Sequence, residues 1–205
     1  MLLTQGLACL RGDRLLFKNV EFELNAGGLL YVLGENGSGK SSLLRMLCGL
    51  MLPESGTVFW NKKPIKEESE SYLSNLTYIG HLNGLKDDLT ALENLTMSAR
   101  AAGNEVSEDK ALAALAAIGI ERCANLPARV LSQGQKRRVT LAKLWLAEGK
   151  LWILDEPFAA LDIASVSILA AKLGEHLSSG GMAILTTHQD VAIHAQSTQT
   201  LRLSE

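Results

Sequence analysis

The sequence predicts an α/β fold: a mixed or parallel sheet at the core, an antiparallel β region at the N-terminus and an inserted α-helical subdomain. Apolar runs typical of buried strands occupy residues 29–33, 151–154 and 182–186. A helical pattern covers residues 163–177, between the last two runs. Residues 90–149 are helical in pattern and rich in Ala and Leu. Strands and helices that alternate around a helical block are typical of an α/β domain with a helical insertion.

Composition limits the size and the partners of the protein. The 205 residues suffice for one core and a small subdomain, but not for two full domains. The formal net charge of -2 gives no reason to expect a nucleic acid or an anionic membrane as a partner. The 3 cysteines are far apart, which predicts a reducing compartment without a disulfide framework or zinc site. No signal peptide is expected, and no apolar run approaches the roughly 18–20 residues that span a bilayer.

The first third of the chain combines strands, a turn and a helix. Residues 1–33 alternate apolar and polar side chains, which predicts half-buried strands before the buried run. A glycine-rich turn follows, and then a helix with leucines at helical spacing between residues 43 and 50. The charged segment 62–71 is predicted to be a solvated loop or an insertion, and residues 76–80 a further strand.

Capping residues predict where three later helices begin. Thr90 with Glu93 fits a capping box, in which each side chain bonds the backbone N–H of the other residue. Ser107 is expected to cap a second helix, and Ser132 with Gln135 repeats the capping box for a third.

The segment GENGSGKS (residues 34–41) matches the phosphate-binding pattern G-x-x-x-x-G-K-S between a predicted strand and a predicted helix. Glycines let backbone amides surround a phosphate, the helix N-terminus adds partial positive charge, and Lys40 adds a full charge. A glycine turn that merely joins strand to helix is the weaker interpretation of this full match. The Ser41 hydroxyl is placed to bind Mg²⁺. The predicted nucleotide-binding residues of this segment are Gly34, Glu35, Asn36, Gly37, Ser38, Gly39, Lys40, Ser41 and Ser42.

An acidic strand end supplies the second motif. The run LWILDEP (residues 151–157) places Asp155 where it can hold Mg²⁺ directly or through water. Glu156 would point toward the γ-phosphate and polarise the attacking water. The alternative is an acidic strand end with Glu156 merely solvated.

The run LSQGQKRRV (residues 131–139) resembles the signature motif of ABC-type ATPases, usually LSGGQ, with Gln133 where glycine is commoner. On its own, Ser132 could simply begin a helix. FAALD, which ends at Asp162, resembles the D-loop of the same family, and TTH, which ends at His188, resembles its switch histidine. These ordered motifs cover most of the chain.

This resemblance implies a P-loop NTPase of ABC type that uses ATP and Mg²⁺. Residues 1–205 would form one ABC ATP-binding domain, with a catalytic core at 1–85 and 150–205 and a helical subdomain at 86–149. In the family two copies form a homodimer with ATP between them, and His188 helps Glu156 to position water. Asp162 would bridge the interface. The residues expected to contact the nucleotide of the second copy are Ser132, Gln133, Gly134 and Gln135.

Two positions depart from the family pattern. Where an aromatic commonly stacks on adenine, the equivalent residue is Arg11, whose guanidinium can also stack, with Phe17 as the aromatic alternative or a core residue. Where the family has glutamine after a strand, this chain has His81. The resemblance gives His81 contact with water and with Mg²⁺, although a lone histidine there could be purely structural. Residues 82–88 would then contact a transmembrane subunit.

The chain most closely resembles the ATP-binding subunits of bacterial cytochrome c maturation systems, often called haem exporter ATP-binding subunits. The compact length, His81 and the runs at residues 137–146 and 151–162 carry this resemblance. It implies a peripheral ATPase at the cytoplasmic face of the bacterial inner membrane, working with integral membrane subunits and, indirectly, with a haem chaperone. ATP hydrolysis would drive haem export or release of the haem-loaded periplasmic chaperone.

Other functions have weaker support in the sequence. An ABC transporter subunit for a different substrate fits the same motifs. A soluble ABC ATPase acting on DNA or ribosomes usually carries coiled coils or two ATPase units, and the sequence has neither, so no nucleic-acid partner is expected. The signature motif argues against a small-molecule kinase. The four histidines form no recognisable haem-ligand pair.

Overall fold

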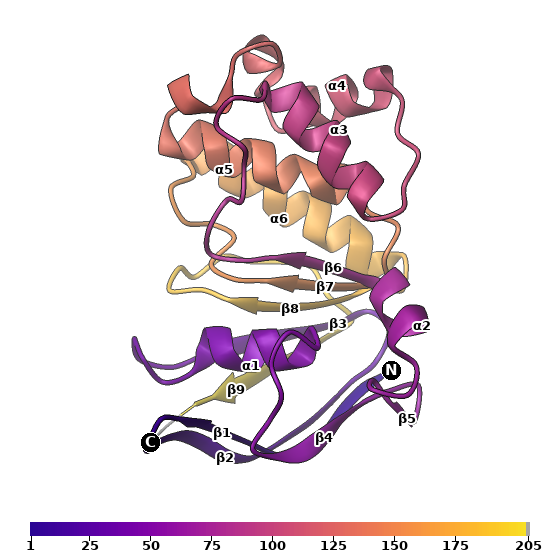
Figure 1. Cartoon of the computed structure of the whole chain (residues 1–205), viewed down its shortest axis with the longest axis vertical. Coiled ribbons are helices and arrows are strands. Elements are labelled where there is room, and N and C mark those ends of the chain that lie inside the picture. Colours follow the sequence, from indigo (N-terminus) through magenta and orange to yellow (C-terminus); the bar gives the residue numbers. More distant parts are fainter. Residues whose placement is uncertain (204–205) are drawn as a thin grey trace.

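A parallel sheet forms the centre of the computed structural model, which describes residues 1–203 (Figure 1). Its strand order is β6-β7-β8-β3-β9, and each neighbouring pair is parallel. The carboxyl ends of these strands therefore meet at one edge, where the segments that follow them come together. The strands are β3 (Gly28–Leu33), β6 (Leu76–Ile79), β7 (Leu151–Leu154), β8 (Met182–Thr186) and β9 (Ser197–Arg202).

A separate antiparallel sheet contains the N-terminal strands in the order β2-β1-β4-β5. In Figure 1 it lies below the parallel sheet, with helix α1 (Lys40–Leu47) between the two. Its strands are β1 (Leu2–Arg11), β2 (Arg14–Leu24), β4 (Ser55–Trp60) and β5 (Lys63–Pro64). Together with the parallel sheet, this confirms the predicted α/β fold class.

Helices cover the other face of the parallel sheet (Figure 1). They are α3 (Ala91–Ala101), α4 (Glu108–Ala117), α5 (Gln133–Leu141) and α6 (Ile163–Ser178), joined in part by 3₁₀ turns at Glu121–Cys123, Ala128–Val130 and Ala142–Trp145. The predicted caps are confirmed, because Thr90, Ser107 and Ser132 each accept a hydrogen bond from the backbone three residues later. Among residues 1–203, no helix combines the length and apolar character that crossing a bilayer requires.

The central strands β7 and β8 of the parallel sheet are buried on both faces, as their continuous apolar runs require. Alternate side chains enter two hydrophobic clusters. Trp152, Leu154 and Leu185 pack with α3 to α6, whereas Ile153 and Ile184 pack with α1 and the antiparallel sheet. The strand ends at the carboxyl edge are thus held rigidly from both sides.

The charged segment 62–71 is not simply a loop, and this prediction was wrong. Strand β5 lies within it and α2 (Ser69–Ser74) begins there. The reason is apolar anchoring: the buried Tyr72 packs against Trp60, with ring centroids 5.5 Å apart. The predicted first helix also ends earlier than residue 50, because Gly49 adopts φ 72°, a left-handed conformation that terminates helices. Leu50 is 66% exposed.

Candidate active site

One cavity collects most of the residues predicted to contact a nucleotide. It has a volume of about 340 Å³ and lies where β3, β6 and β7 end. Five separate segments meet there: the end of β1, Leu16 on β2, the glycine-rich loop after β3 with the start of α1, His81 just beyond β6, and the acidic turn after β7. The predicted residues that line it are Arg11, Asn36, Gly37, Gly39, Lys40, Ser41, Ser42, His81, Asp155 and Glu156.

The glycine-rich loop has little space for larger residues. Gly39 adopts φ 98°, and a Cβ atom there would lie 2.9 Å from the ring of Phe17. Phe17 is buried beneath the loop, so it belongs to the core and cannot stack on a base. Ser38 is also buried, and a Cβ on Gly34 would lie 2.5 Å from its hydroxyl. These contacts fix the loop in one compact shape.

Lys40 reaches across this loop. Its Nζ donates hydrogen bonds to the carbonyl oxygens of Gly34, at 2.7 Å, and Glu35, at 3.1 Å. The side chain is 9% exposed and borders the cavity. A phosphate in the cavity would therefore meet an ammonium group that the loop already holds in place.

The two acids after β7 are held by Thr186, which has no individual role among the predicted site residues. Asp155 is 3% exposed, and its Oδ1 accepts a hydrogen bond from Thr186 Oγ1 at 2.7 Å. The same Thr186 oxygen accepts the backbone N–H of Glu156 at 2.8 Å. Glu156 has φ 49°, a left-handed conformation that costs a non-glycine residue about 1–3 kcal/mol.

Arg137 holds the same turn from the other side, and sequence reasoning missed it as well. It lies on α5, is 4% exposed, and donates to the carbonyl oxygens of Gly80 (3.0 Å), Asp155 (2.9 Å) and Glu156 (2.8 Å). Burial lowers the pKa of its guanidinium, while the nearby carboxylates of Asp155 and Glu156 raise it. In sequence it is one of several basic residues on a helix, and only burial distinguishes it.

His188 lies beside Glu156, with His188 Nε2 3.3 Å from Glu156 Oε1. It follows β8 and lines a second cavity of about 830 Å³ together with Gly34, Glu35 and Asn36. The predicted switch histidine, the predicted base and the glycine-rich loop are therefore neighbours. The His188 side chain is 58% exposed, which leaves it accessible to a ligand.

The signature residues lie away from this cavity in the same chain. Ser132 caps α5 and accepts the backbone N–H of Gln135 at 3.2 Å, while the Gln135 side chain accepts the backbone N–H of Ser132 at 2.8 Å. Ser132 and Gln133 are exposed. Gly134 packs closely on the loop before α6, since a Cβ there would lie 2.8 Å from the carbonyl oxygen of Ala160. The four signature residues thus form a helix start that is exposed at its first two residues and partly exposed at the next two.

Asp162 caps α6, and its Oδ1 accepts the backbone N–H of Ser165 at 2.8 Å. Hydrogen bonding from Ser165 lowers the pKa of this carboxyl below its ordinary value. The predicted interface acid is therefore also a helix cap.

The segment after His81 is hydrogen-bonded to two helices. The buried Asn94 on α3 accepts the backbone N–H of Lys86 at 2.7 Å and donates to the Lys86 carbonyl at 3.0 Å. Thr140 on α5 donates to the carbonyl of Asn83 at 3.0 Å. His81 itself is exposed and borders the cavity from the β6 side.

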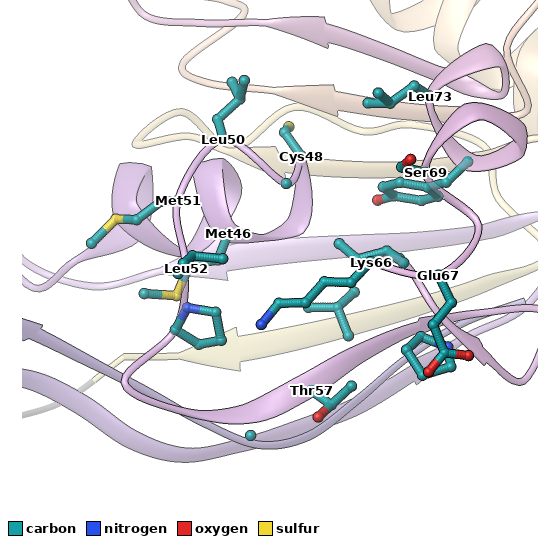
Figure 2. A pocket seen from close by; sticks show the side chains of 17 residues that line it. Met46, Cys48, Leu50, Met51, Leu52, Thr57, Lys66, Glu67, Ser69 and Leu73 are labelled. Carbon is teal, nitrogen blue, oxygen red and sulfur yellow. The ribbon is translucent and has the colours of Figure 1, made fainter.

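An apolar pocket of about 420 Å³ lies at the other end of α1, away from these residues (Figure 2). Leu50, Met51 and Leu52 border one side and α2 the other, with Leu73 on α2 (Figure 2). None of the predicted site residues lines this pocket. Cys48 beside it is buried, and burial raises the pKa of its thiol, which makes it a poor nucleophile.

The sequence of residues 17–159 matches the model of the ABC transporter family. The chain belongs to the ABC transporter family. Its relatives include the "Cytochrome c biogenesis ATP-binding export protein CcmA" of Nitrosomonas europaea, 50% identical over 204 residues that cover 100% of this chain and 96% of that protein. The protein of the same name from Aromatoleum aromaticum is 51% identical over 206 residues, with 100% and 96% coverage. The predicted resemblance to this subfamily is confirmed.

Solved structures agree with the ABC fold. An ATP-binding subunit of an ABC transporter superposes with a TM-score of 0.82 at 28% identity, covering 92% of this chain and 79% of that one. A dimeric bacterial ABC transporter cassette superposes with a TM-score of 0.81 at 23% identity, covering 92% and 88%.

Proposed function

We propose that this protein is the ATP-hydrolysing subunit of a membrane ABC complex for cytochrome c maturation. In this proposal ATP hydrolysis drives haem export or release of a haem-loaded periplasmic chaperone. The observation that carries it is identity of about 50% over essentially the whole length with the cytochrome c biogenesis ATP-binding export proteins. The convergence of the nucleotide motifs on one cavity supports the ATPase activity.

The chemistry assigned to the site is attack of water on the γ-phosphate. Backbone amides of the glycine-rich loop and Lys40 would hold the phosphates, and Glu156 would accept the proton of the attacking water. His188, next to Glu156, would orient the same water and contact the γ-phosphate. His81 also lines the cavity and would contact water there. Arg11, exposed at the rim, would stack on the adenine.

The oxygen atoms at the site fit Mg²⁺. The Ser41 hydroxyl and the Asp155 carboxylate border the same cavity, and Thr186 orients Asp155 through Oδ1. Mg²⁺ commonly takes one or two protein oxygens and completes its shell with phosphates and water. Residues 1–203 contain no group of three or more His, Cys, Asp or Glu that could hold a metal alone, which suits such a shared site. When bound, Mg²⁺ would neutralise phosphate charge. His81 is a further candidate ligand.

A homodimer would complete the site. Ser132, Gln133, Gly134 and Gln135 are exposed or partly exposed and do not line the cavity of their own chain, so a second copy could present this helix start to the nucleotide. Asp162 caps α6 at the end of the loop on which Gly134 packs, and it would lie at the interface. The partners in the membrane would be integral subunits, with the protein peripheral at the cytoplasmic face.

The test uses Glu156→Gln, which keeps the shape of the side chain but cannot accept a proton. Hydrolysis should fall about 10²–10⁴-fold while ATP binding persists, giving an ATP-dependent dimer in gel filtration. Glu148→Gln, an exposed carboxylate before β7, is the control and should behave like the wild type. Hydrolysis at the wild-type rate by Glu156→Gln would refute the role of Glu156.

A second measurement separates the ATPase from its pathway. Lys40→Ala in the bacterium should abolish haem-stained c-type cytochromes, because the phosphate-binding charge is lost. Normal cytochrome maturation in this strain, with ATP hydrolysis lost by the purified variant, would leave the ATPase assignment intact and contradict the cytochrome c role.

A further inference from the structure

Arg137 contacts three carbonyl groups on two functional segments with one buried side chain. Its Nη1 donates to the carbonyl of Gly80, the residue before His81, and its Nη2 donates to the carbonyls of both Asp155 and Glu156. The guanidinium carries a permanent charge in a nearly fully buried place, since Arg137 is 4% exposed. A buried charge is retained only where its surroundings compensate it, and here backbone carbonyls do so.

The turn that Arg137 contacts is strained. Glu156 has φ 49° and can keep this conformation only if neighbouring groups hold it. Two hydrogen bonds do so from opposite sides: Thr186 Oγ1 accepts the N–H of Glu156, and Arg137 donates to its C=O. Together they fix both peptide groups around this residue and therefore the direction in which its carboxylate leaves the backbone.

The shape of the guanidinium matters for this arrangement. Two separate NH₂ groups in a fixed planar fork reach the Gly80 carbonyl, just beyond β6, and the carbonyls of the turn after β7 at the same time. An ammonium presents all its donors from one nitrogen atom and lacks this fork. The neighbouring Arg138 makes no comparable contact, with one long bond of 3.4 Å to the Gly119 carbonyl. Within residues 1–203, Arg137 is the α5 residue whose side chain hydrogen-bonds the acidic turn.

We propose that Arg137 is a positioning residue for Glu156: it holds the strained turn so that the carboxylate points at the attacking water. This inference rests on the proposed function, in which Glu156 is the base. Because Arg137 lies on the helix that Ser132 begins, it also ties the signature helix to the catalytic turn of the same chain. Through its bond to the carbonyl of Gly80, Arg137 also links the residue before His81 to the catalytic turn.

The first test measures the turn directly by amide hydrogen exchange. In Arg137→Gln the peptide covering residues 155–159 should exchange about tenfold faster, because a hydrogen bond to a charged group is lost. Arg100→Gln, an exposed arginine on α3, is the control and should leave this peptide unchanged. Unchanged exchange in Arg137→Gln would overturn the proposal, whatever the ATPase activity of the protein.

The second test measures catalysis by steady-state hydrolysis over a range of ATP concentrations. Arg137→Gln should lower kcat about tenfold with KM for ATP within about twofold, since a bond that only positions the base acts on the transition state. In a Glu156→Gln background the same substitution should change the residual rate less than about twofold, because the base through which it acts is gone. A full additional loss in that background would overturn the proposal.

A third variant covers the case in which Arg137→Gln unfolds. Arg137→Lys keeps the charge but not the fork, so both exchange and kcat should still depart from the wild type. A wild-type rate and wild-type exchange in Arg137→Lys would show that the charge alone suffices and would refute positioning by the guanidinium. If the wild type itself hydrolysed no ATP, the proposed function would fail, and hydrogen exchange would still decide the structural part.

Discussion

Thr186 is the residue on which both acids of the site depend. A single hydroxyl donates to Asp155 Oδ1 and accepts the N–H of Glu156, and the side chain is fully buried. A hydroxyl can serve both groups because it is a donor and an acceptor at once. The carboxylate that would face Mg²⁺ and the one that would face water are thus set by the same oxygen atom.

Thr186→Val should lower both stability and activity. Valine has the same shape but leaves a buried N–H and a buried carboxylate without a partner, which costs about 1–3 kcal/mol in the free energy of unfolding. We expect kcat to fall about tenfold or more, since the turn at Glu156 loses one of the two hydrogen bonds that fix it. Thr96→Val on α3 is the control, because the Thr96 hydroxyl donates to the Leu92 carbonyl of its own helix. Equal effects of the two variants in urea unfolding would contradict this role.

At the scale of elements, the start of α5 and the loop before α6 form one packed joint. Gly134 has no side chain and lets the Ala160 carbonyl approach, and Ala160 itself adopts φ 62°. The exposed signature residues sit directly above this contact. Their orientation is therefore sensitive to any atom added at position 134.

Gly134→Ala and Gly174→Ala should have opposite effects on stability. In a helix, alanine is favoured over glycine by up to about 1 kcal/mol. At Gly174 on α6 the new Cβ would have its nearest neighbour at 3.6 Å, so the free energy of unfolding should rise by roughly 0.5–1 kcal/mol. At Gly134 the Cβ would meet a backbone oxygen at 2.8 Å, and the clash should outweigh the gain. Equal stabilisation of both variants in chemical denaturation would show that the contact between Gly134 and Ala160 can widen without a loss of stability.

The elements that the sequence predicts are those with a local cause. Three helix starts follow from caps, and β7 and β8 follow from apolar runs with the bounds expected. Strand β9 was missed because Ser197–Arg202 is mostly polar and exposed, and it is a strand only because β3 offers an edge to pair with. Helix α2 was missed because Tyr72, which anchors it, follows a run of charges.

The site residues likewise fall into those that local sequence predicts and those that only the fold brings together. A contiguous motif predicts residues 34–42 as site residues, and an acidic strand end predicts Asp155 and Glu156. Arg137 and Thr186 act on backbone groups or neighbouring carboxylates that only the fold brings near, so no spacing in the sequence reveals them. The assignments of His81 and Arg11 remain predictions from resemblance, although both border the cavity.

At the scale of the whole molecule, stability should depend on pH through His176, which joins α6 to the sheet. Its ring stacks on Trp152 of β7 with centroids 3.8 Å apart, and its Nε2 lies 3.2 Å from the Met182 carbonyl of β8. Burial lowers the pKa of His176 below its ordinary 6.5. The unfolded chain therefore takes up a proton before the folded one does, so stability is greatest above the unfolded pKa and falls as the pH drops toward the folded pKa.

We expect the free energy of unfolding to fall as the pH drops below the ordinary histidine pKa of 6.5, and to fall less in His176→Phe, which keeps the stack without a titratable group. His194→Gln, at an exposed histidine, is the control and should leave the pH dependence unchanged. Identical pH dependence in the wild type and His176→Phe, measured by urea unfolding, would exclude His176 as the cause.

The two hydrogen bonds of Lys40 to the carbonyls of Gly34 and Glu35 affect how its substitution must be interpreted. Phosphate binding at this lysine is an exchange of partners, since the ammonium leaves or shares carbonyl oxygens that it already contacts. Alanine at this position removes the charge and also the hydrogen bonds that link the glycine-rich loop to the start of α1. The affinity that Lys40→Ala loses is therefore the sum of a missing phosphate contact and a loss of preorganisation, and only the first belongs to the lysine as a ligand.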